Sequence, residues 1–451
     1  MKRWRQFLLS MGILVLGIIG TALANSGSAR YLFGVFTGRD ANSYFGSAIV
    51  GNADWIGSGK KYIAVGASGF AGELVRSGAV YLYDSLTSDV PAMTLKAIEK
   101  GDLFGYNLSG GGDFNGDAIA DLAVSAPCEW IDPTKRTPGK VYLFLGGEGF
   151  ATRSPIAFSA NESGDAFGLS VSLEADLNGD GLADLVVGAP YSNRGGALAG
   201  TAYIWWGTKD AKNGMKPDIV LRQGTTNDML GSALAVGDLN GDGQADLAVG
   251  APQHNLGDKM PGSVFIYYGG SRAKWEQASL ILSGEATSFY DHFGAAVAIV
   301  GDVNGDGGND LLVGAPRVKT ATGEEGRVYL FSGGAALDAK ADGVMNGSMS
   351  LGHFGSAIYA VGDLNEDGKA DFAVQTKNGA EGRGVVSFYY GGWETAFYEM
   401  EGEAVGDIVG NSVAALGDMN GDGTKDVAVG ARWSDAGARD AGRVYLLSFP
   451  R

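Results

Sequence analysis

The sequence predicts an all-β fold, a seven-bladed β-propeller with four-stranded blades whose ring is closed by the N-terminal strand. Three observations support this prediction. An acidic loop of the form D-x-N-x-D-G-x-x-D recurs at intervals of 63, 62, 64, 61 and 55 residues. Each loop lies among short segments of β-type composition. The last repeat lacks one strand, and an extra strand-like segment precedes the first repeat.

Each repeat has the same parts in the same order. An aromatic or apolar residue followed by glycine opens it, and a short strand, the acidic loop, a second strand such as LAVGAP, a variable loop and a third strand follow. A weaker fourth strand, such as residues 217–224, precedes the next opening. The openings are Phe45-Gly46, Phe104-Gly105, Phe167-Gly168, Leu230-Gly231, Phe293-Gly294, Phe354-Gly355 and Val409-Gly410. The third strands are expected at 78–83, 139–145, 200–206, 262–268, 326–331, 384–390 and 442–447.

The length of the repeat indicates a propeller, because four strands in about 61 residues make one blade. The 427 residues after position 24 divide into seven copies of 61. The last copy ends after its third strand at 443–450, and residues 30–38 lie where a fourth strand should precede Phe45-Gly46. We therefore expect the N-terminal strand to complete the last blade, which would leave no exposed edge. An open solenoid would instead need polar caps.

The N-terminal residues resemble a signal peptide. Lys2, Arg3 and Arg5 precede an apolar run from 7 to 19, and an A-x-A cleavage site stands at 22–24. The domains are therefore expected as a signal peptide at 1–24 and one propeller at 25–451. Retention of the run as a membrane anchor is the alternative, although the run is short for a spanning helix. We expect the protein to be secreted, periplasmic or at the cell surface.

Composition narrows the partners and the forces that hold the fold. Removing residues 1–24 changes the formal net charge from −17 to −20, because three basic residues are lost. This acidity argues against binding to nucleic acid or to anionic membranes. Cys128 is the single cysteine, so no internal disulfide can form. Packing, backbone hydrogen bonds and metal must hold the expected monomer together.

The acidic loops have the ligand chemistry of a calcium site. Positions 1, 3, 5 and 9 of each loop can direct oxygens at one ion, position 7 can add a carbonyl, and glycine at position 6 permits the turn. No Cys or His cluster indicates zinc or copper. Asp, Asn and Gly also form ordinary turns, but six loops at matched positions favour calcium, with up to six ions. Ala118 at position 6 is expected to weaken its site, Glu366 at position 4 to be harmless, and the degenerate loop at 54–61 to bind nothing.

These elements resemble the FG-GAP repeats of integrin α-subunit propellers, which also occur in bacterial secreted proteins. The resemblance covers nearly all of the chain after position 24, and it implies calcium loops on one face and partner binding on the other. No inserted domain interrupts the spacing of the repeats and no leg domain is expected, so integrin function is not carried over. The implied ligands are Asp113, Asn115, Asp117 and Asp121; Asp176, Asn178, Asp180 and Asp184; Asp238, Asn240, Asp242 and Asp246; Asp302, Asn304, Asp306 and Asp310; Asp363, Asn365, Asp367 and Asp371; and Asp418, Asn420, Asp422 and Asp426.

The sequence favours a non-catalytic interaction or adhesion module over an enzyme. His292 and His353 hold the same position in two repeats, which favours a shared structural place over catalysis, and no nucleophile motif is present. The variable loops differ from one another, as contact surfaces often do. Protein or glycan ligands are expected there, and a lectin-like propeller or a polysaccharide lyase or hydrolase are the alternatives. The candidate partner-binding residues are Trp130, Tyr191, Arg194, His254, Arg317, Arg432 and Trp433.

Overall fold

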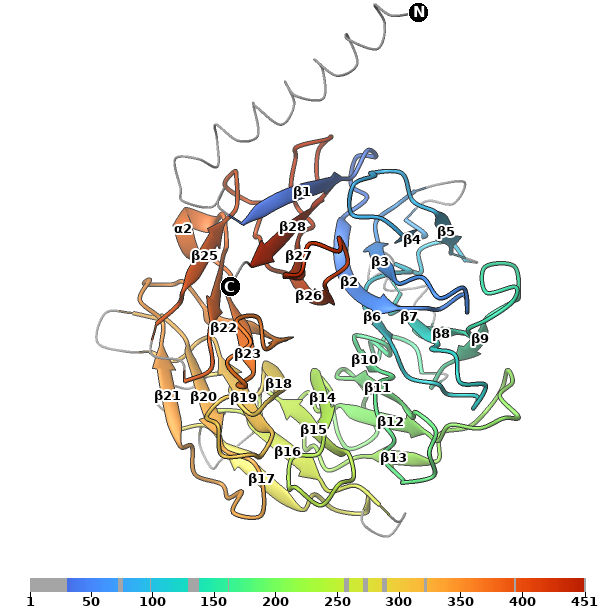
Figure 1. Ribbon diagram of the computed structural model, residues 1–451. Coiled ribbons are helices and arrows are strands. Elements are labelled where there is room, and N and C mark those ends of the chain that lie inside the picture. Colours follow the sequence, from blue (N-terminus) through green and yellow to red (C-terminus); the bar gives the residue numbers. More distant parts are fainter. Residues whose placement is uncertain are drawn as a thin grey trace, which may run out of the picture.

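The chain is seen in a computed structural model in which seven four-stranded sheets surround a central axis (Figure 1). The structure describes residues 31–71, 76–97, 99–128, 138–160, 162–254, 259–270, 275–285, 290–319, 323–392 and 395–449. The predicted signal peptide and Trp130 lie outside these residues.

The strands are short and rich in β-branched and aromatic residues, which suit a pleated surface that is buried on both faces. In chain order they are β1 (Leu32–Thr37), β2 (Phe45–Ala53), β3 (Tyr62–Ala67), β4 (Ala79–Tyr83), β5 (Met93–Lys96), β6 (Leu108–Gly110), β7 (Leu122–Ala126), β8 (Lys140–Phe144), β9 (Ile156–Phe158), β10 (Ser170–Ser172), β11 (Leu185–Ala189), β12 (Thr201–Trp205), β13 (Ile219–Leu221), β14 (Ala233–Gly237), β15 (Asp246–Ala251), β16 (Ser263–Tyr267), β17 (Leu280–Ser283), β18 (Ala296–Gly301), β19 (Asp310–Ala315), β20 (Arg327–Phe331), β21 (Gly343–Asn346), β22 (Phe354–Gly362), β23 (Asp371–Thr376), β24 (Val385–Tyr389), β25 (Tyr398–Glu401), β26 (Ser412–Gly417), β27 (Lys425–Ala431) and β28 (Arg443–Phe449).

The ring is closed by the N-terminal strand, as the sequence predicts. Blades 1 to 6 are formed by consecutive strands, from β2–β5 to β22–β25, with the first strand of each nearest the axis in Figure 1. Blade 7 has the order β1-β28-β27-β26, and β1 pairs antiparallel with β28. Val35 lies opposite Tyr445 and Phe36 opposite Val444. The two ends of the chain therefore share one sheet, in which β28 is paired on both sides and blade 7 has four strands like the other blades.

The core consists of seven apolar layers, each shared by two neighbouring blades. Alternate residues of a strand face opposite blades. In β11, Leu185 and Val187 pack in the layer with blade 2, whereas Val186 packs in the layer with blade 4. The aromatic residue that opens a blade belongs to such a layer; the Phe167 ring, for example, meets Trp205 edge to face at a centroid distance of 5.9 Å. Inter-blade packing, rather than one central core, stabilises the ring.

Two glycines explain why the Phe-Gly and Gly-Ala motifs recur together. Gly231, after the opening residue of blade 4, has a φ of 90°, which favours glycine. Its carbonyl oxygen would lie 2.1 Å from a Cβ added to Gly188 in blade 3. A side chain at position 188 would therefore force the two blades apart. Close approach of the opening segment of one blade to the second strand of its neighbour therefore requires glycine on both sides of this contact.

The predicted strand positions are confirmed with small trims at their ends. The third strand expected at 200–206 spans Thr201–Trp205, because Gly200 has a φ of 79° and bridges to Leu230 instead. The helical element α2 (Gly379–Gly382) is a single turn in which Ala380 and Glu381 have positive φ. Among the described residues, no helix is long and apolar enough to cross a membrane.

Candidate metal loops and channel mouth

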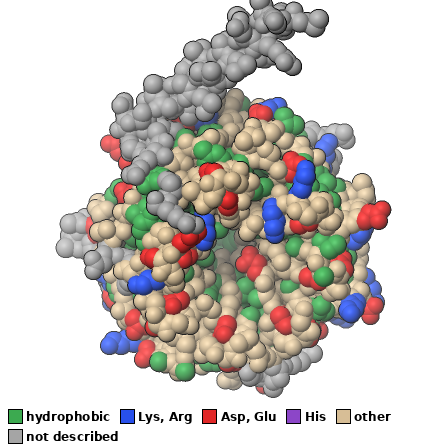
Figure 2. Space-filling view, in the orientation of Figure 1, with side chains coloured by type: hydrophobic (Ala, Val, Ile, Leu, Met, Phe, Trp, Pro, Cys, Tyr) green, Lys and Arg blue, Asp and Glu red, His purple; other side chains and the backbone are tan. Residues whose placement is uncertain are grey.

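The acidic loops and the variable loops lie at opposite ends of the blades. Each acidic loop joins the first and second strands of a blade, and each variable loop joins the second and third. Because neighbouring strands run antiparallel, these two connections fall on opposite faces of the ring. Figure 2 shows Asp and Glu side chains spread around one face of the ring.

In the loop of blade 3, the first three predicted ligands curl around the backbone. Asp176 accepts hydrogen bonds from the backbone N–H groups of Gly179 at 2.7 Å and Gly181 at 2.6 Å. The Asn178 Nδ2 lies 2.9 Å from an oxygen of Asp180. The same Asn–Asp contact, between 2.8 and 3.3 Å, is present in the other five loops: Asn115–Asp117, Asn240–Asp242, Asn304–Asp306, Asn365–Asp367 and Asn420–Asp422.

The ninth residue of each loop is a buried carboxylate. Asp184 is 1% exposed, and its two oxygens accept backbone hydrogen bonds from Leu177 and Gly207, each at 2.8 Å. The pKa of Asp184 is raised to about 7, chiefly by burial and in smaller part by the nearby carboxylates of Asp176 and Asp180. Burial likewise raises the pKa of Asp121 to about 7 and of Asp371 to about 6, and it raises those of Asp246, Asp310 and Asp426.

The loops fit calcium in their chemistry. Each offers only oxygen ligands from its side chains, and in blade 3 the amide of Asn178 lies within hydrogen-bonding distance of the Asp180 carboxylate. A cation would offset the charge repulsion that raises the pKa of the ninth acid. In the described part of the chain, no three His, Cys, Asp or Glu side chains gather closely enough to form a metal cluster. The loop side chains are held instead by backbone N–H groups.

Three loops depart from the common pattern. Ala118 has a φ of 65°, close to the glycine conformation at this position in the other loops. Glu366 has a φ of 59°, in the left-handed region where the matching position of the other loops is glycine. In the first copy, Asp54 accepts backbone hydrogen bonds from Ser58 and Gly59, so the turn persists without the remaining ligands.

The predicted partner-binding residues are only partly brought together. Arg317, Arg432 and Trp433 line a central cavity of about 840 Å³ that inner strands of the blades enclose. Tyr191 lines a neighbouring cavity of about 310 Å³, which shares Tyr106 with the central one.

Two of the predicted residues contact their own blades instead. Arg194 forms an ion pair with Glu162 and lies over the ring of Tyr203, 5.6 Å from its centroid. His254 Nδ1 lies 2.7 Å from Oδ2 of the buried Asp228. Both residues therefore have structural contacts within the described part of the chain.

The sequence analysis did not predict a second series of buried acids. In five blades such an acid lies two residues before the aromatic or apolar residue that opens the blade. The signal was the pattern D-x-Φ-G, in which Φ is the opening aromatic or apolar residue. Its members contact their own blade; Asp102, for instance, accepts a hydrogen bond from the Tyr142 hydroxyl at 3.1 Å. The series is Asp102, Asp165, Asp228, Asp291 and Asp407, each at most 5% exposed.

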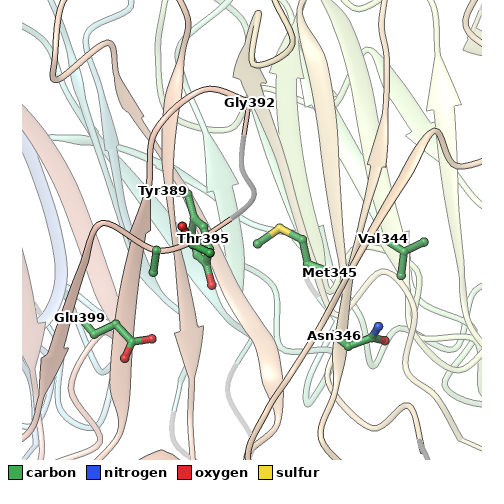
Figure 3. A pocket seen from close by; sticks show the side chains of 8 residues that line it. Val344, Met345, Asn346, Tyr389, Gly392, Thr395 and Glu399 are labelled. Carbon is green, nitrogen blue, oxygen red and sulfur yellow. The ribbon is translucent and has the colours of Figure 1, made fainter.

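A separate groove of about 710 Å³ lies on the outer side of the ring between blades 5 and 6. In Figure 3, Met345 of β21 extends toward Tyr389 and Thr395 of blade 6. None of the predicted site residues that the structure describes lines this groove.

Comparison with known proteins identifies the repeats. The FG-GAP repeat family matches residues 104–144, 167–205, 230–267, 293–331 and 409–447. Each match begins at the opening residue of a blade and ends in its third strand. The chain is a propeller of FG-GAP repeats. The repeats of blades 1 and 6 fall outside these matches, in agreement with the degenerate first loop and the altered Gly-Ala-Pro motif of blade 6.

The FG-GAP propeller is similar to parts of larger proteins. It is 32% identical over 226 residues to integrin alpha-PS2 of Drosophila melanogaster, covering 46% of this chain and 15% of that protein. It is 40% identical over 206 residues to integrin alpha-7 of Mus musculus, covering 45% and 17%. It is 26% identical over 393 residues to phosphatidylinositol-glycan-specific phospholipase D of Bos taurus, covering 74% and 45%. The chain thus spans less than half the length of each of these relatives.

Proposed function

We propose that this chain is a non-catalytic, calcium-binding propeller that acts outside the cytoplasm as a protein-interaction or adhesion module. The observation that supports this most strongly is the separation of two kinds of loop. Six near-identical acidic loops occupy one face, whereas dissimilar loops and a cavity lined by Arg317, Arg432 and Trp433 occupy the other. The similarity to integrin α-subunits and the signal-like N-terminus agree with this role.

In this proposal each ion is held by the Asp, Asn, Asp and Asp side chains at positions 1, 3, 5 and 9 of its loop. Bound calcium supplies positive charge where the loop concentrates carboxylates. The chain contributes a preformed turn, since the position-1 acid already organises the backbone of the loop.

Calcium titration tests the metal assignment. A saturated site adds stability as RT ln(1 + [L]/Kd), about 2.7 kcal/mol at ~100-fold excess over Kd. Excess chelator should lower the melting temperature markedly, and added calcium should restore it. A melting curve that is unchanged by chelator contradicts calcium binding. Magnesium at the same concentration is the control, because its smaller, octahedral shell fits the loops less well.

Partner capture tests the interaction role. Replacement of both Trp130 and Trp433 by Ala should weaken binding of a captured partner by ~2 kcal/mol or more, with calcium affinity retained. Because the Trp433 ring packs edge to face on Tyr44 at 4.8 Å, the melting temperature of the variant is measured alongside. Arg439→Ala is the matched control, since its side chain is 83% exposed in the loop that also holds Trp433. Normal binding by the double variant places recognition elsewhere.

A hydrolytic function is the second candidate. The similarity to a phospholipase D extends over 74% of this chain, although it covers only 45% of that enzyme. His292 and His353 line the central cavity. Turnover of glycosylphosphatidylinositol or polysaccharide substrates by the wild type, lost in His292→Ala, would favour this candidate. Polysaccharide binding without turnover would favour a lectin-like propeller.

A further inference from the structure

The end of the central cavity at the variable-loop face, called the channel mouth below, carries cations near a position where most blades have proline. The Gly-Ala-Pro motif ends the second strand of a blade at the variable-loop face, and its last residue is proline in blades 2 to 5: Pro127, Pro190, Pro252 and Pro316. In blades 6 and 7 this position is Lys377 and Arg432. Arg317 directly follows the proline of blade 5. Three successive blades therefore place a cation at this position or directly after it, and all three cations line the central cavity.

The cations of blades 5 and 6 are only partly neutralised. Glu324 lies 3.5 Å from Arg317 and 3.8 Å from His353. Burial lowers the pKa of both His292 and His353, and the charge of Arg317 lowers each of them further. The pair of histidines therefore stays neutral near pH 7. Within the described part of the chain, no carboxylate forms an ion pair with Lys377.

Arg432 connects blade 7 with blade 2. Its guanidinium carbon lies 5.2 Å from the Trp433 ring centroid and 5.9 Å from that of Tyr106, two blades further round the ring. Its buried Nε has no hydrogen-bond partner among the described residues. The two aromatic rings face this cation, which fixes the guanidinium over the cavity and leaves less ring surface for stacking against a sugar.

The wall below the mouth is suited to an extended main chain. Small polar side chains from several blades alternate there with aliphatic ones, as in Leu108, Leu234 and Val413. The polar members are Ser47, Asn107, Ser232, Ser356, Asn411 and Ser412. Glu174 is the one acid among the described lining residues, and it stands two residues before Asp176, at the metal-loop end of the channel. Positive charge is thus confined to the mouth.

We propose that the channel mouth of this FG-GAP propeller binds an acidic peptide segment, whose carboxylates are held by Arg317, Lys377 and Arg432. Guanidinium groups bind carboxylates through paired charge-assisted hydrogen bonds. The chain as a whole is acidic, with a formal net charge of −17, so the attraction for an acidic segment comes from the local positive charge of these three side chains, which favours acidic over neutral segments. This inference rests on the proposed function, because it names the chemistry of the partner at the variable-loop face.

Fluorescence anisotropy with a labelled tetraglutamate peptide, blocked at both ends, tests the site at saturating calcium. The peptide should bind, and affinity should fall as salt rises because the contacts are ionic. Tetraglutamine of the same length should bind at least 10-fold more weakly. The double variant Arg317→Gln with Lys377→Gln should lose at least 10-fold in affinity for tetraglutamate. The double variant Arg39→Gln with Lys60→Gln, which removes the same charges from exposed positions outside the cavity, should stay within 2-fold of wild type.

Several outcomes would overturn the proposal, and a Lys377→Glu variant gives one further result in its favour. Absence of tetraglutamate binding, equal binding of tetraglutamine, or equal losses in the two double variants each excludes a specific acidic-peptide site. Tighter binding of a galacturonate oligomer than of tetraglutamate assigns the pocket to a glycan instead. A Lys377→Glu variant that prefers tetralysine over tetraglutamate confirms that the mouth charge sets selectivity. If a native protein partner is captured equally by wild type and by the Arg317 and Lys377 variant, the interaction role stands and the channel site fails.

Discussion

The carboxylate of Asp184 accepts a hydrogen bond from the backbone N–H of Gly207 at 2.8 Å, which ties the end of an acidic loop to the end of the third strand of its blade. The next residue, Thr208, donates its backbone N–H to the carbonyl of Phe114 in the loop of blade 2, at 2.7 Å. The ninth acid thus supports the contact between two neighbouring loops. The same pair of contacts recurs in blades 2, 4, 5 and 6.

The fifth and ninth acids of one loop should therefore respond differently to replacement by alanine. Asp184→Ala leaves two buried N–H groups without acceptors, and it should lower the free energy of unfolding in chelator by about 2 kcal/mol or more. Asp180→Ala should change that free energy by less than about 1 kcal/mol, because its carboxylate is exposed. Denaturant unfolding in chelator measures both. Equal stabilities would show that Asp184 has no structural role beyond metal binding.

Calcium stoichiometry separates the loops that bind from the one that does not. Each of Asp180→Ala and Asp184→Ala should reduce the number of bound ions by one, because each removes a proposed ligand. Asp54→Ala in the first copy should leave the number unchanged. Isothermal titration or native mass spectrometry gives the count, and a loss of one ion from Asp54→Ala would contradict the prediction that the first loop is empty.

Strained backbone at two loop positions predicts two stabilising substitutions. Ala118 and Glu366 have φ values of 65° and 59° where the matching loops have glycine. Left-handed backbone costs a residue with a Cβ about 1–2 kcal/mol, and the greater freedom of glycine in the unfolded chain offsets part of the gain. Ala118→Gly and Glu366→Gly should each raise the free energy of unfolding by about 0.5–1 kcal/mol.

The matched control is Gly181→Ala in blade 3. A Cβ at this position would meet nothing within 4 Å, so its φ of 88° is the one source of strain. This variant should be destabilised by about 1 kcal/mol. Stabilisation of Gly181→Ala, or destabilisation of Ala118→Gly, would contradict the strain argument.

Ring closure makes the N-terminal strand as important as any other fourth strand. Phe36 is 2% exposed, and its ring stacks on Tyr83 of blade 1 at a centroid distance of 4.3 Å. Phe36→Ala should lower the free energy of unfolding by about 3–5 kcal/mol. Phe158→Ala, in the fourth strand of blade 2, removes an equally buried ring that packs on Trp205 at 5.2 Å. Urea unfolding should give similar losses for both variants, and a loss below about 1 kcal/mol for Phe36→Ala would show that the ring is not closed in solution.

The regular repeat explains why most of the fold, but not the individual side-chain contacts, could be predicted from the sequence. A period near 61 residues locates the blades, the loops and the missing strand, because each copy repeats the same packing against its neighbour. The partners of individual side chains could not be predicted in this way. Arg432 meets Tyr106 across blade 1, and no local pattern gives that proximity. The buried acids before the opening residues escaped notice because Ser43 and Gly352 replace them in two copies.

The buried acid Asp102 predicts a pH dependence that its replacement should remove. The pKa of Asp102 is raised to about 6, because burial and the Glu99 carboxylate raise it by more than the Tyr142 hydroxyl and Lys140 lower it. The unfolded chain has an Asp pKa near 3.9, so between about pH 4 and pH 6 the folded state retains a proton that the unfolded state releases. The free energy of unfolding therefore falls as pH rises through this window and levels off above it. Asp102→Asn stays neutral throughout and keeps an oxygen that can accept the hydrogen bond from Tyr142. Its free energy of unfolding should therefore fall less than that of the wild type over the same window, and the difference between the two should be at most about 3 kcal/mol. Denaturant unfolding in chelator from pH 4 to pH 7 measures the two slopes, with Asp89→Asn, an exposed acid, as the control. The loop acids titrate in both proteins and cancel in the comparison, so parallel curves for wild type and Asp102→Asn would contradict the assignment.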